Sequence, residues 1–205
     1  MKLYYAPGAC SLAPHIVARE AGIPLTLVKV DILGGHKTED GTDFGTINPR
    51  GYVPALQFDD GKVHTEASVL VQHLADSMPK SGLMPAAGTP ARLVVQEWLN
   101  FVATELHKTF SPWLWNKETA ESTRAAAKAN LAGCFSELDR TLAGRSYLAG
   151  ETFTAADAYA FTIVNWSNFL DIDLKPYPNL SAYMARVAAR PHVREALVAE
   201  GLVKA

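Results

Sequence analysis

The residue best suited to chemistry near the start of the chain is Cys10, in the stretch KLYYAPGACSLAPHIVAREAG between a strand-like run and a helix-like run. A thiol at the first turn of a helix faces unpaired backbone N–H groups and the positive end of the helix dipole, and both favour the thiolate. The alternative is a small buried hydrophobe, as free cysteines often are. Position favours a reactive thiol at Cys10. Cys134 fits the alternative, because it falls in one apolar helical stripe with Leu131, Phe135, Leu138 and Leu142.

A second polar group lies in a helical segment near the middle of the chain. Asn100 and His107 are seven residues apart, so an α-helix places them on one face at about 10 Å along its axis, with Thr104 between them. On these residues alone, His107 is most simply an ordinary surface histidine of an amphipathic helix. The apolar residues of the segment form a different stripe, made of Val95, Trp98, Leu99, Val102 and Leu106.

The first half of the chain has the pattern of a small α/β unit. Pro54 is the odd residue in it, because proline removes a ladder donor; a trans proline at the start of a strand is the simplest reading, and a cis Val53-Pro54 bond is the alternative. The expected elements are strands at 2–5, 24–32, 52–58 and 62–65, a Pro7-Gly8 turn, a helix closed by Gly22, a loop over 33–48, a hairpin turn at 59–61 and a helix at 67–77.

The second half has helical periodicity with hardly any strand signal. A Pro-rich stretch at 79–92 separates it from the first half, and Thr154 with Asp157 has the spacing of a helix N-terminal capping box. We predict an α/β domain over 1–79, a linker at 80–89 and an all-helical domain over 90–205. The expected helices cover 91–110, 119–142, 155–169, 179–189 and 192–200.

Composition excludes several classes of function. The chain has 205 residues with 48% hydrophobic content, and its 19 Lys and Arg against 21 Asp and Glu leave no basic block for nucleic acid or an anionic membrane. No segment reads as a signal peptide or a membrane span. The two cysteines are too few for a disulfide framework and lack metal-ligand spacing, so we expect a cytoplasmic protein without a metal.

The order of these elements resembles the cytosolic glutathione transferases over essentially all 205 residues, and within them the bacterial beta class. The resemblance implies a thioredoxin-like half that binds glutathione, a helical half that supplies most of the electrophile site, and a homodimer. The motifs that carry it are PGACSLAPHI (7–16), NPRGYVPAL (48–56), TEA (65–67), EWLNFVATELHK (97–108), FTAADAY (153–159) and ARPHVREAL (189–197).

The resemblance also assigns roles to residues. Cys10 matches the cysteine beside the glutathione sulfur, Ser11 its hydroxyl neighbour, and His107 a group that donates to or polarises that sulfur. A cis-like Val53-Pro54 would let the Val53 backbone pair with glutathione. The remaining matches are Glu66 and Ala67 at the γ-glutamyl end, with Asn100 and Thr104 lining the site. The loop at 33–41 is one residue longer than the beta-class pattern, and Lys37 is the candidate for the lysine that meets the glycyl carboxylate. Trp113 and Trp115 are either pocket walls or core residues, and Tyr5 is a structural residue.

The function implied is conjugation of the glutathione thiolate to a hydrophobic electrophile in detoxification, with glutathione as cosubstrate and peroxidase or thiol transfer as side activities. One alternative is a monothiol glutaredoxin-like oxidoreductase acting through a Cys10-glutathione mixed disulfide, because no second cysteine follows in Cys10-Ser11-Leu12-Ala13. Another is a ligand carrier without catalysis, since fold does not determine function.

Overall fold

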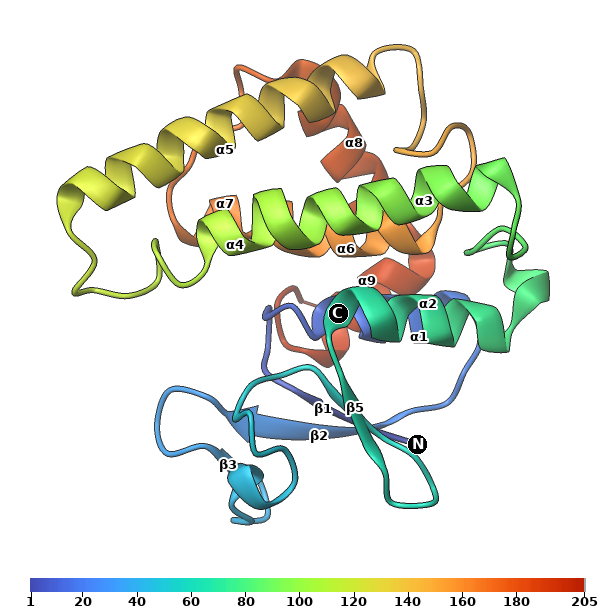
Figure 1. Ribbon diagram of the computed structural model, residues 1–205, viewed down its shortest axis with the longest axis vertical. Helices are drawn as coiled ribbons and strands as arrows, with labels where there is room; N and C mark the ends of the chain where they lie inside the picture. The colour runs from blue at the N-terminus through green and yellow to red at the C-terminus, as the bar shows by residue number, and fades with distance from the viewer. Residues whose placement is uncertain (205) are drawn as a thin grey trace.

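A computed structural model describes residues 1–204, and its two halves differ in architecture (Figure 1). The first half is a five-stranded sheet covered by α1 and α2, and the second half is helical. This confirms the predicted fold class. The first half contains β1 (Lys2–Tyr5), α1 (Leu12–Glu20), β2 (Thr26–Asp31), β3 (Lys37–Thr38), η1 (Phe44–Thr46), β4 (Ala55–Gln57), β5 (Val63–Thr65), α2 (Ala67–Ser77) and η2 (Pro79–Ser81).

The sheet has the strand order β3-β2-β1-β4-β5. β1 and β2 run parallel and are joined by α1, which confirms the predicted βαβ unit, while β4 and β5 form the predicted antiparallel hairpin. Gly22, with φ of +68°, ends α1 as expected. The strand predicted at 52–58 is shorter in the structure. It corresponds to β4, which starts at Ala55, so Pro54 lies outside the ladder and removes no hydrogen bond from it.

The second half consists of helices whose bounds follow the predicted spans closely. The predicted capping box is confirmed at α6, where Thr154 and Asp157 each bond the other's backbone. Every residue of α6 is buried, as its apolar run indicated. The helices are α3 (Pro90–Phe101), the π-helix η3 (Val102–His107), α4 (Lys108–Phe110), α5 (Glu121–Leu142), α6 (Ala155–Val164), α7 (Trp166–Phe169), α8 (Pro178–Ala188) and α9 (Pro191–Ala199).

The expected α-helix over 91–110 is interrupted by the π-helix η3. The apolar stripe is preserved, since Val95, Leu99, Val102 and Leu106 are buried. The expectation that Asn100 and His107 share one face stays a prediction, because it used the α-helical period and a π-helix has a wider turn. Such π segments often occur at functional sites.

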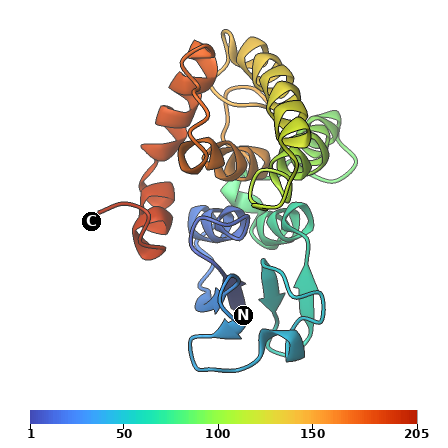
Figure 2. The same ribbon diagram turned by 90° about the vertical axis from the view of Figure 1, so that its left-hand side faces the viewer.

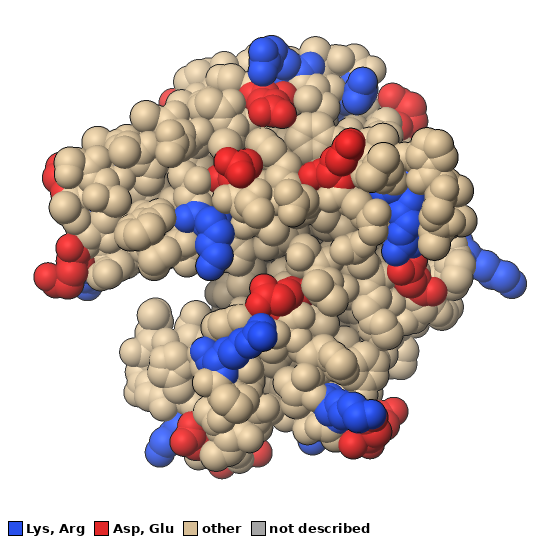
Figure 3. Space-filling model, in the orientation of Figure 1, with Lys and Arg blue, Asp and Glu red and all other residues tan. Residues whose placement is uncertain are grey.

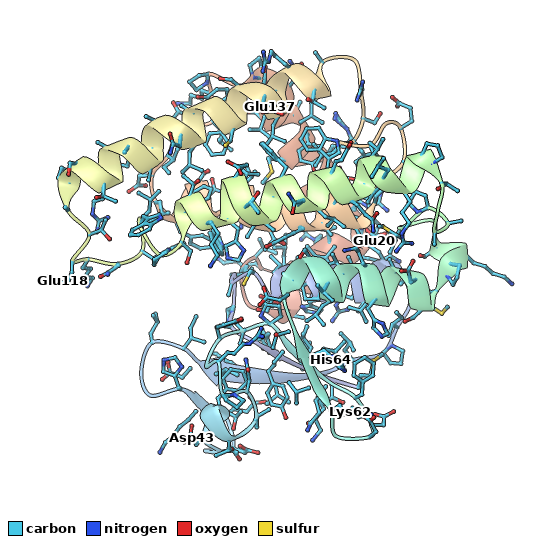
Figure 4. All side chains as sticks on the ribbon, viewed as in Figure 1. Glu20, Asp43, Lys62, His64, Glu118 and Glu137 are labelled. Atoms are coloured by element: carbon cyan, nitrogen blue, oxygen red, sulfur yellow. The ribbon has the colours of Figure 1, made fainter. Side chains whose placement is uncertain are left out.

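The two halves share one hydrophobic core. Buried residues of α1 and α2 belong to the same cluster as those of α3, α5, α6, α8 and α9. Figure 2 shows α9 descending from α8 to lie beside α1, with which it is in contact. Glu20, labelled at the junction in Figure 4, accepts two hydrogen bonds of 2.7 Å from Arg190, so a polar bridge closes the edge of the apolar contact.

Within residues 1–204, no helix combines the length and the apolar character that crossing a membrane requires. The division of the chain at residues 80–89 stays a prediction.

Asp157 is the buried polar centre of the helical half. Its carboxylate accepts from the backbone N–H groups of Leu148 and Thr154 and from the hydroxyls of Thr154 and Tyr183. Asp157→Ala leaves these buried donors without an acceptor, so we expect it to lower the free energy of unfolding by on the order of 3 kcal/mol. Urea denaturation followed by circular dichroism measures this.

The matched control is Glu137→Ala, because Glu137 is an exposed carboxylate of α5 (Figure 4). It should change stability by less than about 0.5 kcal/mol. Equal losses in the two variants would contradict the role given to Asp157.

Candidate active site

Cys10 lies in the turn between β1 and α1, and its thiol faces the loop before β4. The Sγ atom donates to the Val53 carbonyl oxygen at 3.2 Å, and Val53 is buried. The Val53-Pro54 bond is cis, so the trans proline favoured by the residues alone is wrong and the bond implied by the family resemblance is correct. Two of the predicted site residues, Cys10 and Val53, are therefore in direct contact.

The expectation that Cys10 is a thiolate is wrong for the protein without glutathione. Burial raises the pKa of the Cys10 thiol to about 12, and the charge of Glu66 acts in the same direction. The backbone N–H groups of Cys10 and Ser11 lower that pKa, as the helix-terminus argument required, but desolvation is the larger effect. The thiol is consequently neutral at pH 7.

Ser11 is fully buried, and its hydroxyl makes hydrogen bonds to the backbone of its own turn. It accepts from the Ala6 N–H at 3.2 Å and lies 3.3 Å from the Ala6 carbonyl oxygen, to which it donates. These contacts close the turn that carries Cys10. The structure therefore places Ser11 beneath the turn, where it holds the backbone.

Glu66 and Ala67 form the corner at which β5 passes into α2. Glu66 has a φ of +71°, an uncommon conformation for a residue with a side chain, and such local strain tends to collect at functional sites. Its Oε1 accepts from the Tyr52 hydroxyl at 2.7 Å and from Arg50 Nη1 at 3.1 Å. Arg50 and Tyr52 were missed at the sequence level, although both stand in the motif NPRGYVPAL.

His107 is partly buried, at the end of the π-helix. Its Nδ1 lies 2.7 Å from the Tyr159 hydroxyl of α6, and its ring meets that of Trp166 edge to face with centroids 5.1 Å apart. Burial lowers the pKa of His107 to about 4, so the imidazole is neutral at physiological pH. An ordinary surface histidine is excluded by these contacts.

Trp166 connects His107 to the turn that carries Cys10. Its indole N–H donates to the Gly8 carbonyl at 2.8 Å, and its ring packs on His107. Burial raises the pKa of Tyr159, the hydroxyl partner of His107. The turn that carries Cys10 and the His107 ring therefore both contact Trp166, at the junction of the two halves. Neither Trp166 nor Tyr159 was singled out from the sequence; Tyr159 closes the motif FTAADAY, which was taken as a folding element.

Three predicted site residues lie apart from Cys10, His107 and their partners. Asn100 and Thr104 are exposed, and the Thr104 hydroxyl donates to the Asn100 carbonyl at 3.1 Å and lies 3.0 Å from Glu105 Oε1. Lys37 is exposed on the short edge strand β3, two strands away from β1. The structure gives none of these three side chains a contact with Cys10 or His107.

The two candidate pocket tryptophans lie in different places. Trp115 is 44% exposed and stacks edge to face on Trp166, at 5.7 Å between ring centroids, beside the half-exposed Phe169. It therefore lies next to the His107 cluster. Trp113 instead lines a separate hollow with Lys108 and the first turns of α5. Neither tryptophan is a core residue.

A notch opens on the surface between the helical half and the sheet half, visible at the left of Figure 3. Charged side chains of both signs lie on its rims. In the same orientation, the ribbon of the segment between β1 and α1 lies at the inner end of this notch (Figure 1). Among residues 1–204, no three His, Cys, Asp or Glu side chains are grouped as metal ligands.

The candidate site thus has two parts: a small sheet that carries cis-Pro54 and Cys10, and a helical half that supplies His107. The profile of the glutathione S-transferase N-terminal domain matches residues 8–77, and that of the C-terminal domain matches residues 101–191. The glutathione S-transferase GstA of Escherichia coli O157:H7 is 43% identical over 202 residues, which cover 98% of this chain and 100% of GstA. The chain belongs to the glutathione S-transferase family.

Solved structures agree with this assignment. A sphingomonad glutathione S-transferase complexed with glutathione is 44% identical, with a TM-score of 0.93 over 99% of this chain and 100% of that one. The beta-class glutathione S-transferase of Sphingomonas chungbukensis is 42% identical, with a TM-score of 0.94 over 99% of this chain and 100% of that one. The predicted resemblance to the bacterial beta class is confirmed.

The neutral state of Cys10 can be tested by alkylation with iodoacetamide in the absence of glutathione. Because the pKa is raised to about 12, the thiolate fraction should be about 10⁻⁴ at pH 8, and the rate should rise about tenfold for each pH unit between 7 and 9. Cys10→Ser, which retains Cys134, gives the background rate. A plateau of the Cys10 rate near pH 7 would show that the helix terminus outweighs desolvation.

Proposed function

We propose that the protein conjugates glutathione to hydrophobic electrophiles at the junction of its two halves. The observation that carries the proposal is the 3.2 Å contact between Cys10 Sγ and the Val53 carbonyl, because it brings a thiol to the backbone edge that can pair with a peptide. Glutathione would lie along Val53 with its sulfur between Cys10 and His107.

The proposed pose places the γ-glutamyl end at the N-terminus of α2. An anionic carboxylate is favoured there by the free N–H of Ala67 and the helix dipole. Glu66, held by Arg50 and Tyr52, would face the positively charged amino group of the same end. We assign the glycyl carboxylate to Lys37, which is the candidate cation on the exposed edge of the sheet.

In this pose, His107 acts as a neutral hydrogen-bond donor. The pKa of Tyr159 is raised by burial, so its hydroxyl keeps its proton and can donate to Nδ1 of His107. That arrangement leaves the His107 proton on Nε2, available to the glutathione sulfur. The donor stabilises the thiolate after its proton passes to water, and the thiolate then forms the carbon–sulfur bond while the halide of an aryl halide leaves with its electron pair.

The electrophile would bind on the aromatic surface of the helical half. Trp115 and Phe169 are half exposed, and both lie against or beside Trp166, which contacts His107. A flat apolar molecule could stack there within reach of the sulfur. Asn100 of α3 and Thr104 of η3 would contact this molecule, or glutathione, with their exposed side chains.

The glutaredoxin-like alternative is less well supported by the chemistry of Cys10. A thiol that is neutral at pH 7 and donates to a backbone carbonyl is a poor nucleophile toward a disulfide. We therefore assign conjugation as the main activity and thiol transfer or peroxide reduction as side activities.

The first test is turnover of glutathione with a chromogenic aryl halide. The purified protein should exceed the uncatalysed rate, and His107→Phe, which keeps a ring against Trp166, should lower kcat at least about tenfold. His73→Phe is the matched control, because His73 is an exposed histidine of α2 whose ring packs edge to face on Phe58, at 5.1 Å between ring centroids. Absence of turnover by the unmodified protein would refute the proposal.

Cys10→Ala separates the two activities. Conjugation should persist, whereas reduction of a glutathione mixed disulfide should fall to background, because only the second reaction needs the Cys10 sulfur. Loss of conjugation in this variant would instead make Cys10 part of the conjugating machinery.

We also propose a cytoplasmic homodimer with a detoxification role. Both cysteines are free, in keeping with a reducing compartment. Val69 of α2 and Leu93 and Val94 of α3 are exposed apolar residues of two helices that lie on the same side of Figure 1. A second copy would cover this face.

Sedimentation velocity tests the dimer. The unmodified protein should sediment as a dimer, and Leu93→Glu should shift it toward monomer, because it introduces a charge into an apolar contact. Leu33→Glu, at a residue 95% exposed in the loop after β2, should leave the dimer intact. A monomeric unmodified protein at micromolar concentration would exclude this interface.

A further inference from the structure

Gly8 is held by the helical half at both of its backbone polar groups. Its N–H donates to Glu200 Oε2 at 2.9 Å, and its carbonyl accepts from Trp166 Nε1 at 2.8 Å. Gly8 has a φ of +72°, and a Cβ at this position would meet Leu202 at 3.3 Å and Phe169 at 3.4 Å. The place of this peptide is thus defined by α7 and by the residues that follow α9.

Glu200 is itself fixed by a chain of side chains from α1. Its Oε1 lies 2.9 Å from Nδ1 of His15, and these side chains are only 0% and 3% exposed. Arg19 Nε donates to Nε2 of the same ring at 2.9 Å. Because a guanidinium only donates, Nε2 is an acceptor, and the ring proton lies on Nδ1 and is donated to Glu200. Both carboxylate oxygens of Glu200 are therefore occupied by donors.

The Gly8 peptide belongs to a rigid turn that includes Cys10. The Ala9 N–H donates to the Ala6 carbonyl at 3.0 Å, the Leu12 N–H donates to the Ala9 carbonyl at 3.0 Å, and Ser11 bonds Ala6 from below. A displacement of Gly8 must consequently displace Cys10. Since Trp166 also packs on His107, the same peptide sets the distance between the groups supplied by the two halves.

We propose that Glu200, oriented by His15, is a positioning residue for the transferase reaction: it fixes Gly8, and through the hydrogen bond between Gly8 and Trp166 it fixes the place of the His107 ring relative to the turn that carries Cys10. The proposal rests on the role proposed above for His107. A buried carboxylate requires donors to offset its desolvation, and here those donors are the peptide of the active-site turn and the histidine beneath it.

The test is Glu200→Gln, which preserves the shape of the side chain. Gly8 N–H and His15 Nδ1–H both donate, but a Gln amide offers one acceptor and one donor, so one contact becomes donor against donor in either orientation. We expect kcat for conjugation to fall about tenfold or more, because a displaced Gly8 shifts Trp166 and the His107 ring packed on it, and small displacements of a catalytic group lower the rate strongly. Calorimetric affinity for glutathione should change less than about threefold, because Val53, Glu66 and Ala67 are unaltered.

A second readout follows the turn directly. A loosened turn exposes the Cys10 sulfur, so its alkylation by iodoacetamide at pH 8 should become at least about threefold faster in Glu200→Gln. The matched control is Glu195→Gln, because Glu195 is a nearby glutamate, on α9, that contacts Arg19 at 3.3 Å but is 53% exposed. Its kcat and alkylation rate should stay within about twofold of the unmodified protein.

The His15 variants provide a rescue. The amide of His15→Asn can occupy the place of Nδ1 and donate to Glu200, so this variant should retain most of the turnover, whereas His15→Leu should reproduce the loss in Glu200→Gln. If Glu200→Gln does not fold, this pair decides the matter, and equal kcat values in the two His15 variants would overturn the proposal.

A Glu200→Gln protein with lowered thermal stability but unchanged kcat and alkylation rate would also overturn it, because Glu200 would then serve stability alone. Failure of the proposed function is recognisable separately. In that case His107→Phe leaves kcat unaltered, while the alkylation rate of Cys10 still reports whether Glu200 holds the turn.

Discussion

Removal of water from the Cys10 thiol and the His107 imidazole is the constraint on which the proposed chemistry of this protein depends. Desolvation disfavours the charged form of each group, so it raises the pKa of one and lowers the pKa of the other. The proposed site therefore has two neutral polar groups, and backbone N–H groups lie beside Cys10. Such a site suits an anion that arrives with the ligand, because neutral donors stabilise it without adding a charge of their own.

The same constraint explains why the site is built from both halves. The sheet half alone provides Cys10 and Val53 but leaves them at the edge of a small domain, where water would reach them. Trp166 and Tyr159 close this region from the helical half, and the indole N–H satisfies the Gly8 carbonyl as it does so. The contact between the two halves is thus what buries Cys10 and His107.

Much of the fold could be predicted from the sequence. The βαβ unit, the hairpin and the capping box of α6 follow from local patterns, because alternation, turn residues and the Thr154–Asp157 spacing act over short distances. The cis Val53-Pro54 bond and the environment of His107 depend on residues far away in the chain. The resemblance to a known family identified the bond, but nothing local announced the π-helix before His107.

The site shows the same limit. A thiolate at Cys10 was a reasonable inference from its position at a helix start, yet the balance was decided by packing that no short pattern describes. Tyr159 and Trp166 were not predicted, because each gains its role through a partner distant in the sequence. Arg50 and Tyr52 were not predicted either, although they stand in a motif that carries the family resemblance and their common partner, Glu66, is nearer in the sequence.

The continuous core across α1, α2, α6 and α9 has a consequence for how such proteins can change over evolution. The two halves are not interchangeable modules. A helical half exchanged between relatives would bring a new electrophile surface, but it would also have to bring matching partners for α1 and for the Gly8 peptide. New specificity is therefore more readily acquired by substitutions on the exposed aromatic surface than by recombination at the linker.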